Sequence, residues 1–176
     1  MGASGASYSR VAKLKSSDKT DAFDCGQTDL NQFLQRHALG NQKANSAQTY
    51  VCSTCKSNPP EIVGFYSLVV GSVSHASAPA RVVKGLAAHP VPVMILARLA
   101  VSLAHQKKGL GQALLRDALL RTAQAADIAG VRTLLVHAKD DAARQWYTDW
   151  GFEPSPSDPY HLHLMLKDLK ALIARA

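Results

Sequence analysis

LARLAVSLAHQKKGLGQALL, residues 96–115, joins an apolar, strand-like run to a glycine loop that opens an amphipathic helix. The loop has the spacing Gln-x-x-Gly-x-Gly, which is neither the Walker A pattern nor the dinucleotide pattern Gly-x-Gly-x-x-Gly. Glycines let the backbone approach an anion closely, and the first N–H groups of a helix point outward without partners. The stretch therefore predicts a pyrophosphate-binding loop. The alternative is an ordinary capped helix of the core.

The hydrophobic pattern of the remaining chain predicts a layered α/β (α+β) domain. An early antiparallel hairpin is followed by the order strand, helix, strand, helix, strand, which favours one mixed central sheet with helices on both faces. Residues 75–92, with three prolines, are expected to form an irregular connection with room for a short helix. The expected strands are 8–14, 48–55, 61–74, 93–101, 133–138, one opening at Phe152, and 160–166; the expected helices are 28–44, 109–127, 140–150 and 167–176.

Length and composition favour one globular domain over residues 8–176, after a flexible start at residues 1–7. The chain has 176 residues, of which 47% are hydrophobic, and no apolar run reaches the length of a membrane span. The start lacks the features of a secretory signal, so a cytoplasmic location is expected. An odd count of three cysteines argues against a disulfide framework. Neither Cys52-x-x-Cys55 nor the scattered histidines complete a metal site, so no metal is expected.

The charge balance predicts a polyanionic partner. Twenty Lys and Arg residues against thirteen Asp and Glu residues give a formal net charge of +7, and such a domain attracts nucleic acid and other polyanions. Arg98 stands apart because it lies inside an apolar strand, where an arginine must be paired or must face a cavity. Candidate substrate-binding residues are Arg36, Lys43, Arg81, Lys84, Arg98 and Arg144.

Three separated segments carry a resemblance to the GNAT family of N-acetyltransferases. They are the stretch 96–115, the sequence DAARQWYTDWGF at 141–152 and GFYSL at 64–68, and together they cover most of residues 20–167. The resemblance implies a GNAT-like fold with acetyl-CoA as co-substrate and Tyr147 as the catalytic general acid. It implies that backbone groups of Leu99, Ala100 and Val101 bind the pantetheine arm, and that the pyrophosphate is held by Gln106, Lys107, Lys108, Gly109, Leu110, Gly111, Gln112 and Ala113.

A narrower likeness involves FDCG at 23–26 and LNQFL at 30–34, together with GFYSL and LAV at 99–101. These segments resemble the acetyltransferase toxins of type II toxin–antitoxin modules. The resemblance implies acetylation of the amino group of aminoacyl-tRNA, which blocks translation, and an antitoxin partner with a ribbon-helix-helix DNA-binding domain. A homodimer is expected, because two copies offer a dimeric antitoxin two attachment points.

Acetyl transfer from a thioester needs a proton for the leaving thiolate, and Tyr147 is the candidate donor. A tyrosine has a reference pKa of about 10, so it is protonated at neutral pH and can donate to the leaving thiolate. The alternative is a core aromatic, since Tyr147 lies on the apolar face of its helix. The α-amino group of an aminoacyl ester has a pKa below about 8 and is largely neutral already, which makes the absence of a glutamate in the central strand intelligible.

Two choices stay open on the sequence. Arg98 can meet a substrate phosphate, CoA or an internal carboxylate. The rival functions are an N-acetyltransferase for a small amine or a protein amine, and a non-catalytic module that binds nucleic acid or protein on a GNAT scaffold.

Overall fold

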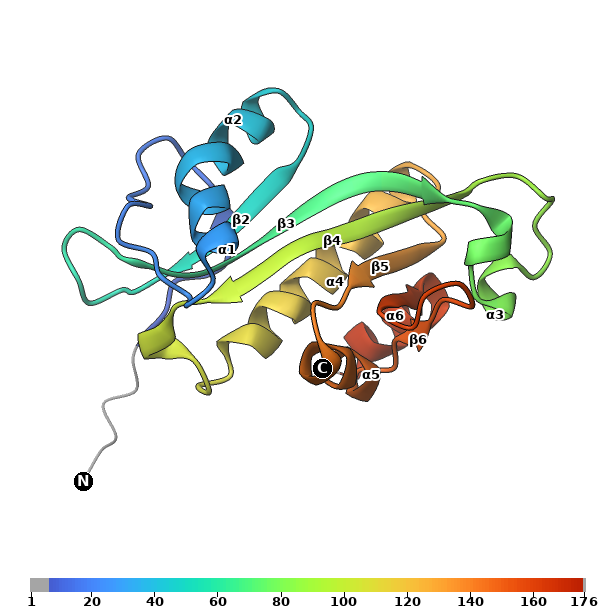
Figure 1. The fold of residues 1–176 in the computed structure, drawn as a ribbon. Helices are drawn as coiled ribbons and strands as arrows, with labels where there is room; N and C mark the ends of the chain where they lie inside the picture. Colours follow the sequence, from blue (N-terminus) through green and yellow to red (C-terminus); the bar gives the residue numbers. More distant parts are fainter. Residues whose placement is uncertain (1–6, 176) are drawn as a thin grey trace. The chain divides into compact units, whose positions relative to one another are not determined.

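The computed structural model describes residues 7–175, and seven strands of these residues form one sheet (Figure 1). The strand order is β1-β2-β3-β4-β5-β7-β6. The sheet is mixed, because β4 and β5 pair in parallel while β1–β2, β2–β3, β5–β7 and β6–β7 pair antiparallel. The strands are β1 (Ala12–Lys13), β2 (Gln48–Ser53), β3 (Ile62–Val73), β4 (Val91–Val101), β5 (Thr133–His137), β6 (Glu153–Pro154) and β7 (His161–Met165).

Helical segments alternate with these strands. The region before β2 is helical in three consecutive pieces, and the middle piece, η1, is a π-helix. The segments are α1 (Thr28–Gln32), η1 (Phe33–His37), α2 (Ala38–Lys43), the 3₁₀ turns η2 (His75–Ser77) and η3 (Leu103–His105), α3 (Ala80–Val83), α4 (Leu110–Ile128), α5 (Asp141–Asp149) and α6 (Leu166–Ala174).

The mixed sheet and most of the expected elements are confirmed. The helix expected over 109–127 is α4, and the helix expected over 140–150 is α5. Asp140 caps α5, because its Oδ1 accepts a hydrogen bond from the Ala143 N–H at 2.8 Å. Gly151 lies just past the end of α5 with a φ of +96°, a conformation that glycine adopts without strain.

The first expected strand is the main difference. Only Ala12–Lys13 of residues 8–14 forms a strand, and Tyr8 makes an isolated bridge to Thr54. Ser9 explains the short pairing on the N-terminal side. Its N–H donates to the Ser53 carbonyl at 2.8 Å, but the Ser53 N–H donates to the Ser9 hydroxyl at 2.9 Å instead of to a backbone carbonyl. The flexible start predicted for residues 1–7 lies outside the described residues, except for Ser7, whose carbonyl accepts a hydrogen bond from the Cys55 N–H.

The described residues group into two compact units. The first unit comprises the chain up to Leu68 together with Arg98–Asp117, and the second comprises Val69–Ala97 together with the chain from Ala118 onward. One domain over residues 8–176 stays a prediction.

Helices cover both faces of the sheet in the first unit. Phe65 of β3 contacts Phe23 edge-on and stacks on Phe33 of η1. Its neighbour Gly64 points to the opposite face, since successive strand residues alternate. A Cβ added at Gly64 would lie 2.9 Å from a methyl group of Leu114 in α4. The absent side chain of Gly64 therefore lets the first turns of α4 approach β3.

The second unit has its own apolar core. Val82 of α3 packs with Val91 and Val93 of β4 and with Leu135 of β5. The Arg132 side chain donates hydrogen bonds to the Val82 and Lys84 carbonyls at 2.7 and 3.2 Å, which fixes the end of α3.

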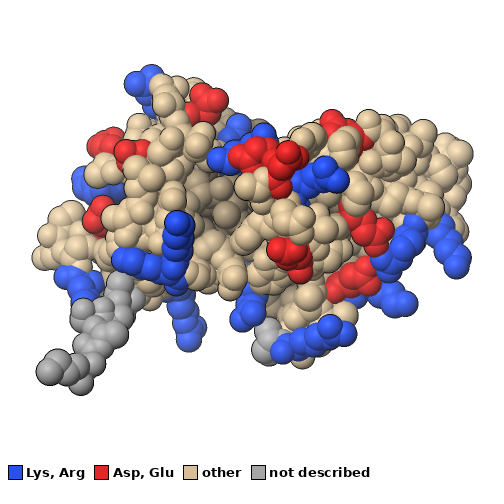
Figure 2. All heavy atoms as spheres, turned by 60° about the horizontal axis from the view of Figure 1, so that its bottom comes forward, with Lys and Arg blue, Asp and Glu red and all other residues tan. Residues whose placement is uncertain are grey.

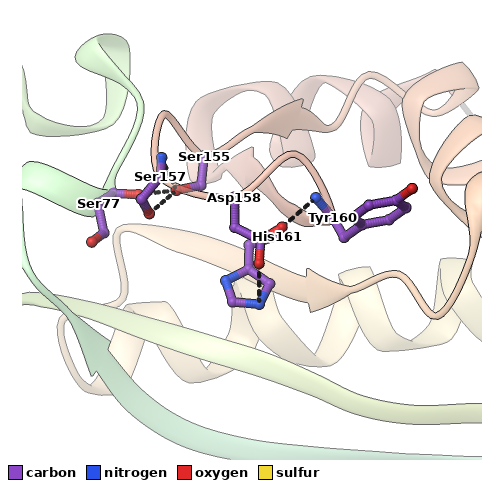
Figure 3. Close-up of polar contacts among 6 residues, drawn as sticks. All are labelled: Ser77, Ser155, Ser157, Asp158, Tyr160 and His161. Carbon is purple, nitrogen blue, oxygen red and sulfur yellow. Dashed lines mark hydrogen bonds and ion pairs between the residues drawn. The ribbon is translucent and has the colours of Figure 1, made fainter.

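Polar contacts, some within the loop and one to Ser77, fix the loop between β6 and β7 (Figure 3). Ser155 donates a hydrogen bond to the Ser77 carbonyl and contacts the hydroxyl of Ser157. The Asp158 carboxylate accepts from the Tyr160 N–H at 2.9 Å and lies 3.5 Å from Nε2 of His161.

One buried histidine in this unit predicts a pH-dependent stability. His163 is only 2% exposed, burial lowers its pKa from 6.5 to about 4, and its Nδ1 has no hydrogen-bond partner among the described residues. Between these two pKa values the unfolded chain binds a proton that the folded chain excludes, so the folded state becomes less stable as the pH is lowered. We expect the free energy of unfolding to fall by about 2 kcal/mol from pH 7 to pH 5, since one pKa unit is worth about 1.4 kcal/mol.

Urea unfolding at both pH values measures this loss. The variant His163→Leu keeps the site apolar and removes the titration, so its stability should depend less on pH. Some dependence should persist, because the pKa of His137 is also lowered, mainly by burial and then by His161. An unchanged pH dependence in His163→Leu would contradict the assignment.

Candidate functional site

The predicted glycine loop is an exposed turn between β4 and α4, in the first unit. Residues 106–109 are exposed, and Leu110, the first residue of α4, is buried. Lys107 and Gly109 have φ values of +60° and +84°. A Cβ added at Gly109 would meet nothing within 4 Å, so the glycine is required by its backbone conformation and not by crowding. The loop presents its backbone to solvent ahead of a 19-residue helix.

Gln106, the first residue of the motif, is directed inward to the loop's own scaffold. Its Nε2 donates to the Val101 carbonyl at 3.0 Å and to the Cys25 carbonyl at 3.2 Å. The side chain thereby joins the end of β4 to the segment 23–27 ahead of α1. Backbone groups and the two lysines are left to contact a ligand.

A short hydrogen-bond network fixes that segment in turn. The Asp24 carboxylate accepts from the Gly26 N–H at 2.8 Å and from the Asn31 side chain at 2.9 Å. Asn31 accepts from the Cys25 N–H, and the Leu103 N–H donates to the Asp24 carbonyl. The hydrogen bonds from Gly26 and Asn31 lower the pKa of Asp24. Sequence reasoning gave Asp24 and Asn31 no role, although Asp-x-Gly is a turn signature.

The end of β4 extends beyond its pairing with β5. The two strands pair in parallel over Val93–Leu96 only. Leu99, Ala100 and Val101 follow this paired segment, so they are not among the residues of β4 that pair with β5. A strand edge of this kind offers alternating N–H and C=O groups to an extended ligand that carries amides.

Arg98 precedes this segment and rests on an aromatic ring. Its guanidinium carbon lies 3.7 Å from the centroid of Phe33. Partial burial lowers its pKa. No ion pair or hydrogen bond joins Arg98 to another residue between 7 and 175, so the internal carboxylate considered from the sequence is not found there.

Tyr147 lies in α5, in the second unit. Its ring contacts Trp146 and Phe152 edge-on, with centroid distances of 4.9 and 5.3 Å. Burial raises its pKa above the usual 10, so the hydroxyl keeps its proton throughout the physiological range. Within residues 7–175 the hydroxyl forms no hydrogen bond. The side chain is therefore a proton donor that no other described residue engages.

The predicted basic residues differ in how their charges are used. Arg36, Lys43 and Lys84 are exposed, whereas Arg144 is half-buried with its guanidinium carbon 5.8 Å from the centroid of Tyr160. Arg81 forms ion pairs with Glu153 and, at 3.1 Å, with Asp168. Arg36, Lys43 and Arg98 belong to the first unit and Arg81, Lys84 and Arg144 to the second. In the face drawn in Figure 2, basic side chains are interspersed with acidic ones.

The described residues contain neither a metal-binding cluster nor a membrane-spanning helix. No disulfide bond links Cys25, Cys52 and Cys55 in this part of the chain. No group of three or more His, Cys, Asp or Glu residues between 7 and 175 is arranged to hold a metal ion. No helix in this part of the chain has the length and hydropathy needed to cross a membrane.

Comparison with known proteins identifies the family. The family model described as "Acetyltransferase (GNAT) domain" matches residues 45–154. A protein of Mycobacterium tuberculosis named "tRNA-acetylating toxin" is 45% identical over 166 residues, which are 94% of this chain and 97% of that protein.

Two solved structures of the toxin AtaT share the fold. AtaT complexed with acetyl-methionyl-tRNAfMet is 23% identical with a TM-score of 0.85, over 94% of this chain and 98% of that chain. A mutant AtaT bound to the C-terminus of the antitoxin AtaR and acetyl-CoA is 23% identical with a TM-score of 0.78, over 94% and 97%. The family match and the mycobacterial relative decide the assignment: this chain belongs to the GNAT acetyltransferase family and is an N-acetyltransferase.

Proposed function

We propose that this chain is the toxin of a type II toxin–antitoxin pair, and that it transfers the acetyl group of acetyl-CoA to the α-amino group of aminoacyl-tRNA. The observation that carries the proposal is the 45% identity, along nearly the whole of both chains, to a protein named for acetylating tRNA. Acetylation of that amino group blocks translation, because the acetylated amine cannot attack a peptidyl ester. A substrate of this kind implies that the enzyme acts in the cytoplasm.

The glycine loop is proposed to bind the pyrophosphate of acetyl-CoA. Its exposed backbone and the start of α4 supply N–H donors, and Lys107 and Lys108 add positive charge. Gln106 shapes the loop through its hydrogen bonds to Val101 and Cys25. Leu99, Ala100 and Val101 are proposed to pair with the amides of the pantetheine arm, and the remaining predicted contacts are Gly109, Leu110, Gly111, Gln112 and Ala113.

Tyr147 is proposed as the general acid. Attack of the neutral amine on the thioester forms the amide C–N bond and breaks the C–S bond. The sulfur gains one proton and the nitrogen loses one. The unengaged phenol donates its hydrogen bond, and then its proton, to the leaving sulfur, and it is reprotonated by the proton that nitrogen releases.

The partners follow from the same proposal. AtaT has been solved with the C-terminus of an antitoxin, which supports an antitoxin here. We propose that this antitoxin carries a ribbon-helix-helix DNA-binding domain and that the toxin is a homodimer, so that a dimeric antitoxin has two attachment points.

Incubation of the purified protein with radiolabelled acetyl-CoA and total charged tRNA tests the proposal. Label should appear in the aminoacyl-tRNA fraction and be released as N-acetyl-amino acid when the ester is hydrolysed. Deacylated tRNA is the matched control and should take up no label. Transfer to polyamines or to protein amines, with none to charged tRNA, would replace the proposal by the small-amine or protein-amine alternative.

Salt dependence gives a further prediction. The net charge of +7 leads us to expect that tRNA affinity falls steeply with salt and depends little on sequence. Each neutralised phosphate contributes a slope of roughly −0.7 to −0.9 in a plot of log affinity against log salt. Fluorescence anisotropy between 50 and 200 mM salt, the range over which such contacts are usually compared, measures it. A flat dependence would favour a small-amine substrate. Arg36, Lys43, Lys84 and Arg144 are the candidate contacts, whereas the charge of Arg81 is already paired.

A further inference from the structure

The guanidinium of Arg98 packs on the ring of a buried phenylalanine, Phe33. Its guanidinium carbon lies 3.7 Å above the ring centroid of Phe33. Phe33 is 4% exposed and stacks on Phe65 at a centroid distance of 6.2 Å. Phe33 begins the π-helix η1, and π-helical turns frequently occur at functional sites. A guanidinium placed over an aromatic face is held by the cation–π attraction and keeps its N–H groups for a further partner.

The charge of Arg98 is partly desolvated and unpaired. Removing a cation from water is costly unless an anion or acceptor compensates. No carboxylate or carbonyl within residues 7–175 forms an ion pair or hydrogen bond with this side chain. Arg81, by contrast, has two carboxylate partners. An anionic ligand that accepts hydrogen bonds from Arg98 would offset the cost of desolvating its charge.

The position of Arg98 distinguishes between two sources of that anion. Arg98 lies three residues before Val101, about 10 Å along the strand, and the glycine loop lies beyond Val101. Ala100 shares the face of Arg98, and it packs in the same core cluster as Phe33. Helix α4, whose first turn follows the glycine loop, contacts Gly64 on the opposite face of the sheet. The side chain of Arg98 therefore lies on the face of the sheet opposite to α4, whose first turn is proposed to bind the phosphates of CoA.

We propose that Arg98, held on Phe33, binds the phosphodiester nearest the aminoacylated ribose at the 3′ end of the RNA substrate. The planar guanidinium donates two parallel hydrogen bonds to a phosphate. Arg98 then locates the acceptor end relative to β4, the strand whose last residues are proposed to bind the pantetheine arm. This inference rests on the proposed function and adds to it the group of the substrate that is recognised.

The test compares two substrates that differ in this phosphate. An aminoacylated CCA trinucleotide carries it, whereas the matching aminoacyl-adenosine does not. Arg98→Gln should raise KM for the trinucleotide by about 10- to 100-fold, the range expected for charge-assisted hydrogen bonds. KM for aminoacyl-adenosine and for acetyl-CoA should stay within about twofold of wild type. Arg98→Lys keeps the charge without the planar fork and should be intermediate.

Two further variants control for charge and support. Lys19→Gln removes one exposed positive charge of the first unit and should leave both KM values unchanged. Phe33→Leu removes the aromatic face and should raise KM for the trinucleotide in the same direction as Arg98→Gln. Thermal melting establishes that each variant is folded, and Arg98→Lys provides the test if Arg98→Gln is not.

Each contrary result identifies a different failure. Equal loss on both acceptor substrates would make Arg98 merely structural, and a raised KM for acetyl-CoA alone would assign it to the donor; either overturns the inference. If wild type acetylates no aminoacyl-RNA, the proposed function fails on its own account. Binding of a fluorescent CCA trinucleotide then tests the phosphate site separately. Binding to Arg98→Gln that is about tenfold weaker than to wild type supports the site, and equal binding overturns it.

Discussion

Tyr147→Phe is expected to lower kcat on charged tRNA by roughly 10²- to 10⁴-fold, the usual contribution of general acid catalysis. The substitution removes one oxygen and keeps the ring contacts with Trp146 and Phe152. The hydroxyl forms no hydrogen bond within residues 7–175, so its loss leaves no described partner unsatisfied. Fold and acetyl-CoA affinity should therefore be retained. Single-turnover kinetics with labelled acetyl-CoA, beside calorimetric titration of acetyl-CoA, measures the two effects separately.

Tyr160→Phe is the matched control for this change. Tyr160 lies in the same unit and donates its hydroxyl hydrogen bond to Asp141 at 2.7 Å, at the start of α5. Its loss should change kcat by no more than about threefold, since it removes an exposed hydrogen bond and no proton donor of the reaction. Comparable losses in the two variants, or wild-type turnover in Tyr147→Phe, would return Tyr147 to the interpretation as a packing aromatic.

Local sequence signals predicted the elements that carry the candidate residues. Helix α5 begins one residue after Asp140 and is followed closely by Gly151, because a side-chain cap and a positive φ are properties of single residues. The start of α4 was similarly evident from Gly109 and the apolar spacing after it. The first strand is shorter than predicted, because the Ser53 N–H donates to the Ser9 hydroxyl instead of to a backbone carbonyl, and hydrophobic alternation does not reveal such a contact.

The contacts of the candidate residues could not be predicted in the same way. Arg98 and Phe33 are 65 positions apart in sequence, and Gln106 and Cys25 are 81 apart. Periodicity assigns each residue to a face of its own element, but it does not reveal which residue of another element it meets. For this reason the sequence left a phosphate, CoA and an internal carboxylate open as partners of Arg98. The structure excludes the internal carboxylate among residues 7–175, because none of them forms an ion pair with Arg98.

The roles of Asp24 and Asn31 could not be predicted from the sequence for a related reason. Their hydrogen bonds shape the segment 23–27, which in turn receives the side chain of Gln106. Such residues need not touch a ligand, so no ligand-binding motif contains them. The structure adds them to the site as a support for the loop.

Gly111→Asp is expected to abolish detectable acetyl-CoA binding while the protein stays folded. Gly111 is the second residue of α4, where the helix N-terminus is proposed to face the pyrophosphate. A carboxylate there adds a negative charge and a side chain at the position that an anionic ligand must approach. The same carboxylate suits the first turn of an isolated helix, where it interacts favourably with the helix dipole by about 0.3–1 kcal/mol. Stability should therefore change little while affinity is lost.

Calorimetric titration of acetyl-CoA, with thermal melting of the same samples, measures both quantities. Gly130→Asp is the matched control, because Gly130 is exposed, has an ordinary φ and has open space around the position of a Cβ. This variant makes the same change of net charge outside the loop, so its acetyl-CoA affinity should equal that of wild type. Unchanged affinity in Gly111→Asp would place the pyrophosphate elsewhere and reduce residues 106–113 to the capped start of a core helix. Equal losses in the two variants would instead attribute the effect to net charge, since only a local contact distinguishes position 111 from position 130.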